Sequence, residues 1–386
     1  AMDRLADFVV KRRRPVLWGM TLVVISLLAL IPKNELNDEF VRYFDERVQF
    51  RVDTDFTTEN LTGLYNISYS LGADGSGAVS EPVYLNKLEA FADWYRQQPE
   101  VLHVSSLSDT MKRLNKNLHA DDVAWYKMPD SRELAAQYLL LYEMSLPYGL
   151  DLNNQINVDK SATKLDVSID SLSSNNTLAL EECAQQWLAE HAPEYMQVHG
   201  ASPSIMFSHI GARNIRSMLT GTTLALLLIS FILVIALRSL RIGLISVVPN
   251  LVPAGMAFGL WGLLVGQVGL ALSVVAGMTL GIVVDDTVHF LSKYLRARRE
   301  EGLSSEDAVR YAFHTVGTAL WTTSVVLIAG FLVLTRSPFE LNSGMGLLTA
   351  ITIGLALFAD FLLLPTMLMT LDKKDAYETA TVADPG

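Results

Sequence analysis

The chain has 386 residues, of which 50% are hydrophobic and 18% charged, and its mean hydropathy of +0.28 is high for a soluble protein. Its formal net charge of −11 at pH 7 argues against nucleic acid as a partner, because the phosphate backbone carries the same sign. The single cysteine, Cys183, excludes an intrachain disulfide, and an exported domain without disulfides fits a bacterial cell envelope better than a eukaryotic secretory route.

The hydrophobic residues lie in discrete blocks, and six of these blocks are apolar enough to cross a bilayer, which takes about 20 helical residues. They are residues 16–31, 218–237, 242–265, 268–290, 318–334 and 344–371. The basic run from Lys11 to Arg14 ahead of the first block also resembles the start of a signal peptide. Residues 29–33 lack the small-residue cleavage pattern, so we expect this block to remain as a membrane anchor.

Basic residues flank alternate connections between the blocks, at residues 11–14, 238–241, 293–299 and 373–374. Because cytoplasmic loops are enriched in Lys and Arg, both termini are predicted to lie in the cytoplasm. The predicted order is a cytoplasmic segment 1–14, a first span 15–32, an extracytoplasmic domain 33–217, spans two to four within 218–290, a cytoplasmic amphipathic helix 291–315, spans five and six within 316–371, and a cytoplasmic tail 372–386. The acidic charge resides in residues 33–217, which contain 15 Lys and Arg against 27 Asp and Glu.

The extracytoplasmic domain alternates between strand-like and helix-like patterns. Its predicted strands alternate apolar and polar side chains, and its predicted helices repeat apolar side chains every three or four residues. Two strand–helix–strand units result, at residues 64–71, 82–98 and 101–107 and at residues 164–172, 177–191 and 195–199. Units of this kind predict a ferredoxin-like α+β domain.

Three further helices are predicted. Residues 131–146 carry an apolar surface wider than one packing stripe, which indicates either a buried core helix or the wall of a hydrophobic substrate cleft. Residues 204–217 are predicted to run on as one helix into the second span. Residues 293–313 form an amphipathic stretch that Gly302 interrupts, with a second helix start at Ser304, and are expected to lie along the membrane surface.

The most informative stretch is residues 281–290, GIVVDDTVHF, which places two adjacent carboxylates and a histidine in the fourth span. A charge at the centre of a bilayer costs about 2.5–3.5 kcal/mol on insertion scales, so an ionisable group there is a candidate for ion or proton handling. Asp285 and Asp286 are four and three residues before His289, so either acid can share a helix face with it. Two carboxylates this close in a low dielectric do not both ionise easily, which is the property that a proton carrier needs.

Neighbouring spans offer partners for these acids. Asn250 lies between two prolines of the third span, where a distortion would free backbone groups. Thr322, Thr323 and Ser324 lie in the fifth span, and Asp360 lies in the sixth. On the fourth span itself, residues 277–281 form a small-xxx-small face that lets another helix approach closely.

Each of these residues also has a purely structural interpretation. Lys293 follows the acids by only seven or eight residues, so Asp285 and Asp286 could lie at the cytoplasmic end of the span, where Asp286 and His289 would be solvated. Asp360 could be a helix–helix hydrogen-bond partner, and the two threonines could serve packing alone.

The motifs at residues 248–253 (VPNLVP), 281–290 and 359–365 (ADFLLLP) together resemble the C-terminal half of a resistance–nodulation–division (RND) transporter. The resemblance is to the MMPL branch of hydrophobe exporters, which is related to sterol-sensing-domain proteins. It covers nearly the whole chain and implies the half-repeat of that family: one span, a large extracytoplasmic porter domain and five further spans.

The resemblance also implies that an acid at the position of Asp285 takes part in proton relay within the membrane. A tyrosine often follows that acid in the family, and Asp286 takes its place here, which leaves the partner of Asp285 open. Family members normally carry two such halves in one chain. The chain is therefore expected either to lack an N-terminal half or to assemble as a homo-oligomer.

The leading hypothesis is a proton-motive-force-driven secondary transporter, not an enzyme, that exports a lipid or another hydrophobic molecule. We expect a multi-pass protein of the bacterial inner membrane with its large domain in the periplasm, and with Asp285, Asp286, His289 and Asp360 as proton-relay candidates. The expected partners are the lipid bilayer and a hydrophobic substrate, and no cofactor, metal or nucleic acid is expected. The sequence contains no nucleotide-binding loop that would indicate ATP as the energy source.

Two other classes remain open. One is a sterol- or lipid-sensing or accessory membrane protein without transport. The other is an intramembrane aspartyl protease, which needs one acid on each of two helices. Asp285 and Asp360 could be placed in that role, but the usual Gly-x-Gly-Asp context is missing.

Overall fold

The computed structural model describes residues 2–147 and 150–372 and contains two compact units. We call the first the helical unit; it comprises Ala1–Asn37, Tyr43–Asp45 and Ala212–Gly386. We call the second the α+β unit; it comprises Asp38–Arg42 and Glu46–Gly211. The basic pair 373–374 and the rest of the predicted tail lie outside the described residues.

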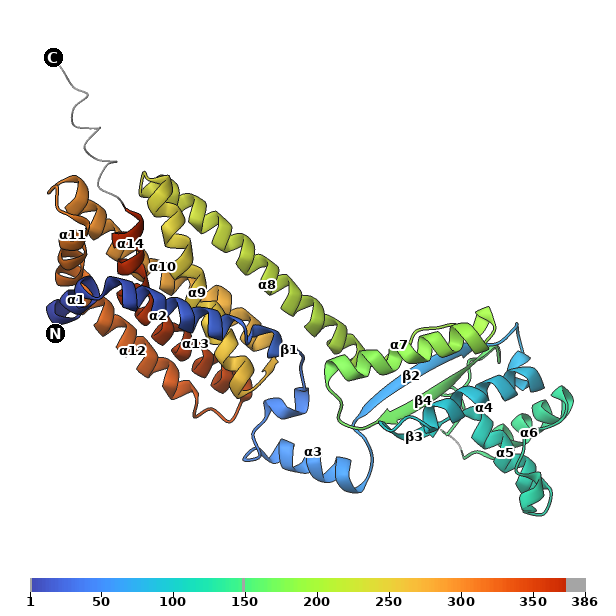
Figure 1. Ribbon diagram of the computed structural model, residues 1–386. Coiled ribbons are helices and arrows are strands. Elements are labelled where there is room, and N and C mark those ends of the chain that lie inside the picture. The colour runs from blue at the N-terminus through green and yellow to red at the C-terminus, as the bar shows by residue number, and fades with distance from the viewer. Residues whose placement is uncertain (1, 148–149, 373–386) are drawn as a thin grey trace. The chain divides into compact units, whose positions relative to one another are not determined.

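Six helical segments of the described chain are long and apolar enough to cross a membrane, which confirms the six predicted spans (Figure 1). In chain order they are α2 (Arg13–Leu28) with η1 (Ile31–Lys33), α8 (Pro203–Ala236), α9 (Leu240–Leu264), α10 (Leu270–Arg299), α11 (Ser305–Ala312) with η6 (Phe313–Gly317) and α12 (Thr318–Leu334), and α13 (Glu340–Phe358) with η7 (Ala359–Leu363) and α14 (Leu364–Leu371). A short amphipathic helix, α1 (Met2–Lys11), precedes them.

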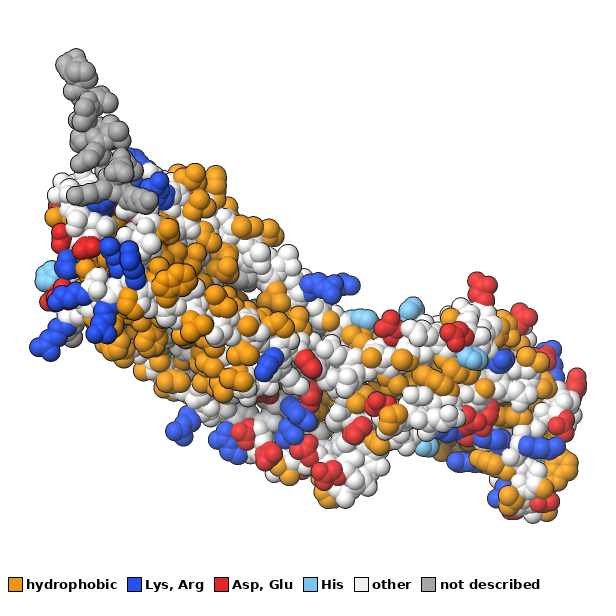
Figure 2. All heavy atoms as spheres, viewed as in Figure 1, with side chains coloured by type: hydrophobic (Ala, Val, Ile, Leu, Met, Phe, Trp, Pro, Cys, Tyr) orange, Lys and Arg blue, Asp and Glu red, His pale blue; other side chains and the backbone are white. Residues whose placement is uncertain are grey.

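Apolar side chains cover much of the visible surface of the helical unit, and Lys and Arg side chains gather near α1 and α11 (Figure 2). Inside the unit, α13 packs against α9, α10 and α12. Two turns of the bundle, η6 and η7, are π-helical and each inserts into an otherwise α-helical span. A short parallel pair of strands, β1 (Glu35–Leu36) and β5 (Gln267–Val268), joins the chain after the first span to the loop before α10.

The predicted helix breaks near residue 302 are present. α10 ends at Arg299, and Gly302 in the following loop has φ +63°, a left-handed conformation that favours glycine. Ser304 then caps α11, because its hydroxyl accepts a hydrogen bond from the backbone N–H of Asp307 at 3.1 Å. Residues 204–217 also belong, as expected, to one uninterrupted helix with the second span, α8.

The crossing of α2 and α9 depends on Gly259. A Cβ atom at this position would overlap the backbone carbonyl of Leu27, which a helix cannot easily move. We expect Gly259→Val to lower the stability of the full chain by about 1–3 kcal/mol, the usual cost of overpacking. Gly281→Val is the matched control, since nothing lies within 4 Å of a Cβ there. Fluorescence-detected melting of both variants in detergent checks this, and equal melting temperatures would contradict it.

The α+β unit contains one three-stranded sheet among its described residues. Its elements are η2 (Phe40–Tyr43), α3 (Gln49–Asn60), β2 (Tyr65–Gly72), η3 (Ala78–Ser80), α4 (Pro82–Arg96), β3 (Val101–Ser105), α5 (Leu107–Leu118), η4 (Val123–Trp125), α6 (Arg132–Ser145), β4 (Ala162–Ile169), α7 (Ser174–His191) and η5 (Glu194–Met196). The strand order is β2-β4-β3, and β4 is antiparallel to both neighbours. The strands β2 and β3 are therefore parallel, with β4 between them, and α4 connects them.

Alternation along the strands builds the core of this unit. Ile67, Tyr69 and Leu71 of β2 are buried together with Leu165 and Val167 of β4. They form one cluster with apolar side chains of α4 and α7. Inside it the hydroxyls of Tyr69 and Tyr95 lie 2.6 Å apart, so each buried polar tip has a partner.

The strand predicted at residues 195–199 is wrong. The segment forms the turn η5 instead, because the N–H groups of Met196 and Gln197 donate to the carbonyls of Pro193 and Glu194. Those N–H groups are therefore unavailable for hydrogen bonds to a neighbouring strand. Pairing at this edge is reduced to one antiparallel bridge between Ser68 and Ala201.

The helix predicted at 131–146 is α6, and the structure divides its wide apolar surface in two. Ala135, Tyr138 and Leu139 are buried in the core, whereas Leu140 and Leu141 are half-exposed. The buried face confirms the core-helix interpretation, and the substrate-cleft interpretation stays a prediction for the exposed face.

Candidate functional site

The carboxylates of the GIVVDDTVHF motif lie on α10 and point in different directions, as neighbouring residues of a helix must. Asp285 faces outward, with 72% of its side chain exposed. One helical turn on, the Nε2 atom of His289 lies 3.5 Å from an Asp285 carboxylate oxygen, and that side chain is 57% exposed. Asp285 and His289 thus form an outer pair on one face of the helix.

The inner face of α10 makes two hydrogen bonds to other spans. Asp286 is partly buried and accepts a hydrogen bond from the hydroxyl of Ser324 on α12, at 3.3 Å. The next residue, Thr287, is fully buried and donates to Oδ1 of Asp360 at 2.9 Å. Asp286 also lies close enough to Asp360 to interact with it electrostatically. The structure therefore brings together acids from the fourth and sixth spans.

Asp360 is the most deeply placed of the four relay candidates, with 1% of its surface exposed. It lies in η7, the π-helical turn. Pro365 contributes to this irregularity, since it has no N–H to donate to the carbonyl four residues earlier. Such π-helical insertions occur frequently at functional sites.

Several buried polar atoms of the helical unit lack a hydrogen-bond partner among the described residues. They are Oδ2 of Asp360, both polar atoms of the Asn250 amide, the hydroxyl of Thr349 and Oδ1 of Asn34. An unpaired polar atom in an apolar interior is costly, and proteins retain such atoms where they serve chemistry or bind a water molecule. Asp360 thus carries a buried oxygen that can hold a proton without breaking its bond to Thr287.

An aromatic cluster lies next to these acids. The rings of Phe290 and Phe313 are 5.3 Å apart, and those of Phe313 and Phe361 are 5.4 Å apart. All three are buried, and they join α10 to both π-helical turns, η6 and η7. Phe361 directly follows Asp360, so any movement of η7 requires these rings to repack.

Thr322 and Thr323 lie apart from the acids. Each is exposed and donates its hydroxyl within α12, to the carbonyls of Thr318 and Ala319 respectively. Ser324, the next residue, is the one that reaches Asp286. Asn250 is buried on α9, and no described residue bonds its amide. The sequence did not single out Thr287, although its place directly after the two acids was a usable signal.

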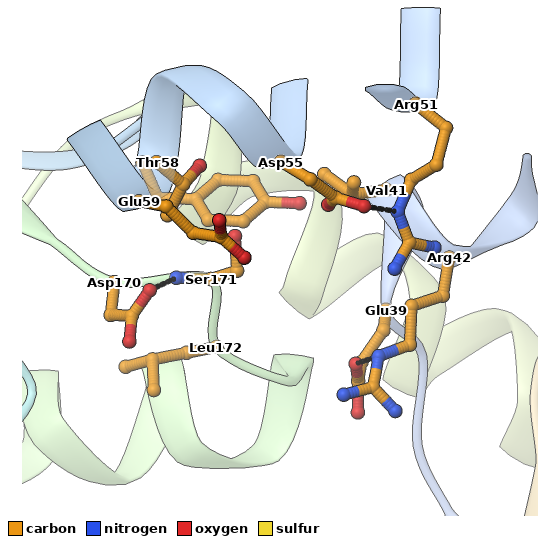
Figure 3. A pocket seen from close by; sticks show the side chains of 11 residues that line it. Glu39, Val41, Arg42, Arg51, Asp55, Thr58, Glu59, Asp170, Ser171 and Leu172 are labelled. Atoms are coloured by element: carbon orange, nitrogen blue, oxygen red, sulfur yellow. Dashed lines mark hydrogen bonds and ion pairs between the residues drawn. The ribbon is translucent and has the colours of Figure 1, made fainter. Parts of the chain in front are cut away.

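A polar pocket of about 210 Å³ lies in the α+β unit, between α3 and residues 170–172 (Figure 3). Both of its arginines are paired with acids of the same pocket: Arg51 with Asp55 at 2.6 Å and Arg42 with Glu39 at 2.5 Å. This lining does not suit a hydrophobic substrate. Among the described residues, no group of three His, Cys, Asp or Glu side chains could hold a metal ion.

Two comparisons with known proteins bear on this site. The sequence profile of the MMPL family matches residues 142–379, which include α8 and every later helix of the bundle. The membrane protein MJ1562 of Methanocaldococcus jannaschii is 27% identical over 148 residues. That match spans 38% of each chain, well under two thirds of the archaeal protein.

Proposed function

The chain belongs to the MMPL family, and from that premise we propose that it is a proton-driven exporter of a lipid or another hydrophobic molecule. The observation that carries the proposal is the buried acid of η7. Asp360 lies within a membrane-spanning segment, bonds to Thr287 of another span and is close to Asp286. An ionisable residue in this setting is by default a candidate for proton handling.

In the proposed mechanism Asp286 and Asp360 bind and release a proton. While the two side chains share one proton, together they carry a single negative charge. Loss of that proton leaves two carboxylates in a low dielectric, and their repulsion favours separation of α10 from η7. The aromatic cluster of Phe290, Phe313 and Phe361 would transmit this movement to η6, because the rings pack between the three segments. The membrane potential supplies about 2.3 kcal/mol per charge per 100 mV for such a step.

The outer pair, Asp285 and His289, is exposed on a membrane-spanning helix. An exposed Asp285 facing lipid would cost about 2.5–3.5 kcal/mol. We therefore propose that a second half-transporter, either a missing N-terminal half or a second copy of this chain, covers Asp285 and His289. Their charges would then face a polar interface, and the proton path would continue across it.

The α+β unit is proposed to be the extracytoplasmic porter domain. The parallel strands β2 and β3 with β4 between them support a ferredoxin-like arrangement, in which the bridge at Ala201 marks the reduced fourth strand. The exposed apolar side chains of α6, Leu140 and Leu141, are candidates for contact with a hydrophobic substrate. We place the chain in a cytoplasmic membrane with both termini inside, on the basis of its basic residues.

Reconstitution tests this function. Proteoliposomes that contain the full chain and a fluorescent lipid are given a pH gradient, and we expect lipid to leave the loaded leaflet only while the gradient lasts. A sensor or accessory protein, the alternative, would bind the lipid without moving it. Infrared difference spectroscopy separates the two classes independently, because a relay requires a carboxyl band that responds to pH and a sensor does not.

A further inference from the structure

A groove on the helical unit contains none of the proton-relay candidates, although one of its walls belongs to η7. It has a volume of about 380 Å³, within the usual range of ligand sites. Its walls come from α2, α9, η7 and α14, and Trp18, Val24, Val252 and Leu363 are among the residues that line it. The groove therefore lies along membrane-spanning segments.

The lining offers a ligand almost only apolar contacts. Its two hydroxyls are already used, because Thr21 donates to the carbonyl of Leu17 at 2.8 Å and Thr370 donates to that of Thr366 at 2.7 Å. No lining group offers a charge to a ligand. Only a hydrocarbon segment gains by entering such a groove.

One end of the groove is basic. Arg14 precedes Trp18 by four residues on α2, so the two side chains share a helix face. Trp18 lines the groove and is 73% exposed, the position that tryptophan favours at a membrane interface. The neighbouring Arg13 is paired with Glu306 at 2.9 Å, whereas Arg14 is exposed and makes no ion pair with any residue that the structure describes.

The groove is long enough for the upper part of one acyl chain. From Leu17 to Val24 the groove follows α2 for about 10 Å, and from Leu363 to Leu371 it follows the sixth span for about 12 Å, at 1.5 Å per residue. It thus runs from the basic end of α2 into the hydrocarbon region. A glycerophospholipid presents this combination, with a negative phosphate at the surface and an acyl chain below it.

We propose that this groove holds an acyl chain of an anionic glycerophospholipid from the leaflet that faces Arg14, with its phosphate against the guanidinium of Arg14. The site goes beyond the proposed transport function and does not depend on it. Leu363 belongs to η7, three residues after Asp360, and packs in one buried cluster with Val24 and Val252. The lipid therefore supports the turn that positions Asp360.

Native mass spectrometry of the full chain in mild detergent tests the site. The chain is titrated with phosphatidylglycerol and, separately, with phosphatidylcholine of the same acyl length. We expect one retained lipid per chain and about fivefold preference for phosphatidylglycerol, the contribution of one basic residue near an anionic headgroup. Equal retention of the two lipids by the wild-type chain would overturn the proposal.

Two variants with matched controls locate the lipid. Arg14→Gln is expected to lose the preference and keep the lipid, while Lys33→Gln, at the other end of the first span, keeps both. Thr21→Trp fills the groove and is expected to lose the lipid, while Leu22→Trp, on the neighbouring exposed face of α2, retains it.

Preference that survives Arg14→Gln, or retention that survives Thr21→Trp, would contradict the proposal. A two-chain mass that Thr21→Trp abolishes would show that a second copy fills the groove, which also overturns it. Each outcome is read from binding alone, so a failure of lipid transport leaves the result unchanged.

Discussion

Asp360→Asn is expected to abolish gradient-driven lipid movement while the chain remains folded. Asparagine has the same shape as aspartate and its oxygen still accepts the hydrogen bond from Thr287, which is 2.9 Å long in the structure. The substitution removes the group that exchanges a proton and leaves the helix contact in place. We expect transport at the level of empty liposomes and a melting temperature close to that of the wild-type chain.

The control for Asp360→Asn is Glu300→Gln, which neutralises an exposed acid at the end of α10 and should transport normally. A second variant, Thr287→Val, keeps the acid but removes its donor. It should transport more slowly, because the carboxyl group loses the hydrogen bond that fixes its orientation against α10. Full transport by Asp360→Asn would remove this residue from the proton path.

Asp285→Asn is the second variant for which we expect loss of transport with the fold intact. Asp285 is exposed on α10 and pairs with His289, which is also exposed, so its removal leaves the packed interior unchanged. The stability of this variant is as informative as its activity. If Asp285 faces lipid, neutralising it should stabilise the chain by a substantial part of the cost of a charge in the bilayer, about 2.5–3.5 kcal/mol.

If a second half covers Asp285, Asp285→Asn should leave stability nearly unchanged and stop transport. The proposed function requires this second result. His289→Gln serves as the comparison, because it removes the partner but keeps the acid, and it should reduce transport less than Asp285→Asn. Normal transport by Asp285→Asn would confine the relay to Asp286 and Asp360 and remove the need for a covering partner at this face.

The sequence predicted the membrane-spanning helices well because each is encoded by a continuous apolar block. The same holds for α4 and the strands β2 and β4, whose periodicity is strong. It did not reveal α3 or α5. The first buries only Thr54, and the second begins at Leu107, within the segment assigned to a strand. Residues 195–199 show why alternation alone does not predict a strand. Their side chains alternate as in a strand, but the backbone N–H groups donate within the turn η5 instead of to a neighbouring strand.

For the site, the sequence identified the acids but could not say which of them meet. Adjacent residues on a helix differ by about 100°, so the placement of Asp285 outside and Asp286 inside depends on how α10 packs. Ser324 was expected from the sequence as one of three neighbouring hydroxyls of the fifth span, and its hydrogen bond to Asp286 identifies it as the one that meets an acid. Thr287 was recognised through its contact with the sixth span. The π-helical turn η7 has no periodic signature, although Pro365 marks its end.

The most direct test of the account is simultaneous measurement of proton flux and lipid movement in proteoliposomes that contain the full chain. A dye inside the vesicles reports pH while a quenchable lipid reports transfer. We predict that lipid moves only with proton flux and that Asp360→Asn abolishes both signals together. Lipid movement that persists without a gradient, or in the Asp360→Asn variant, would contradict the claim that this chain couples protons to export through its buried acid.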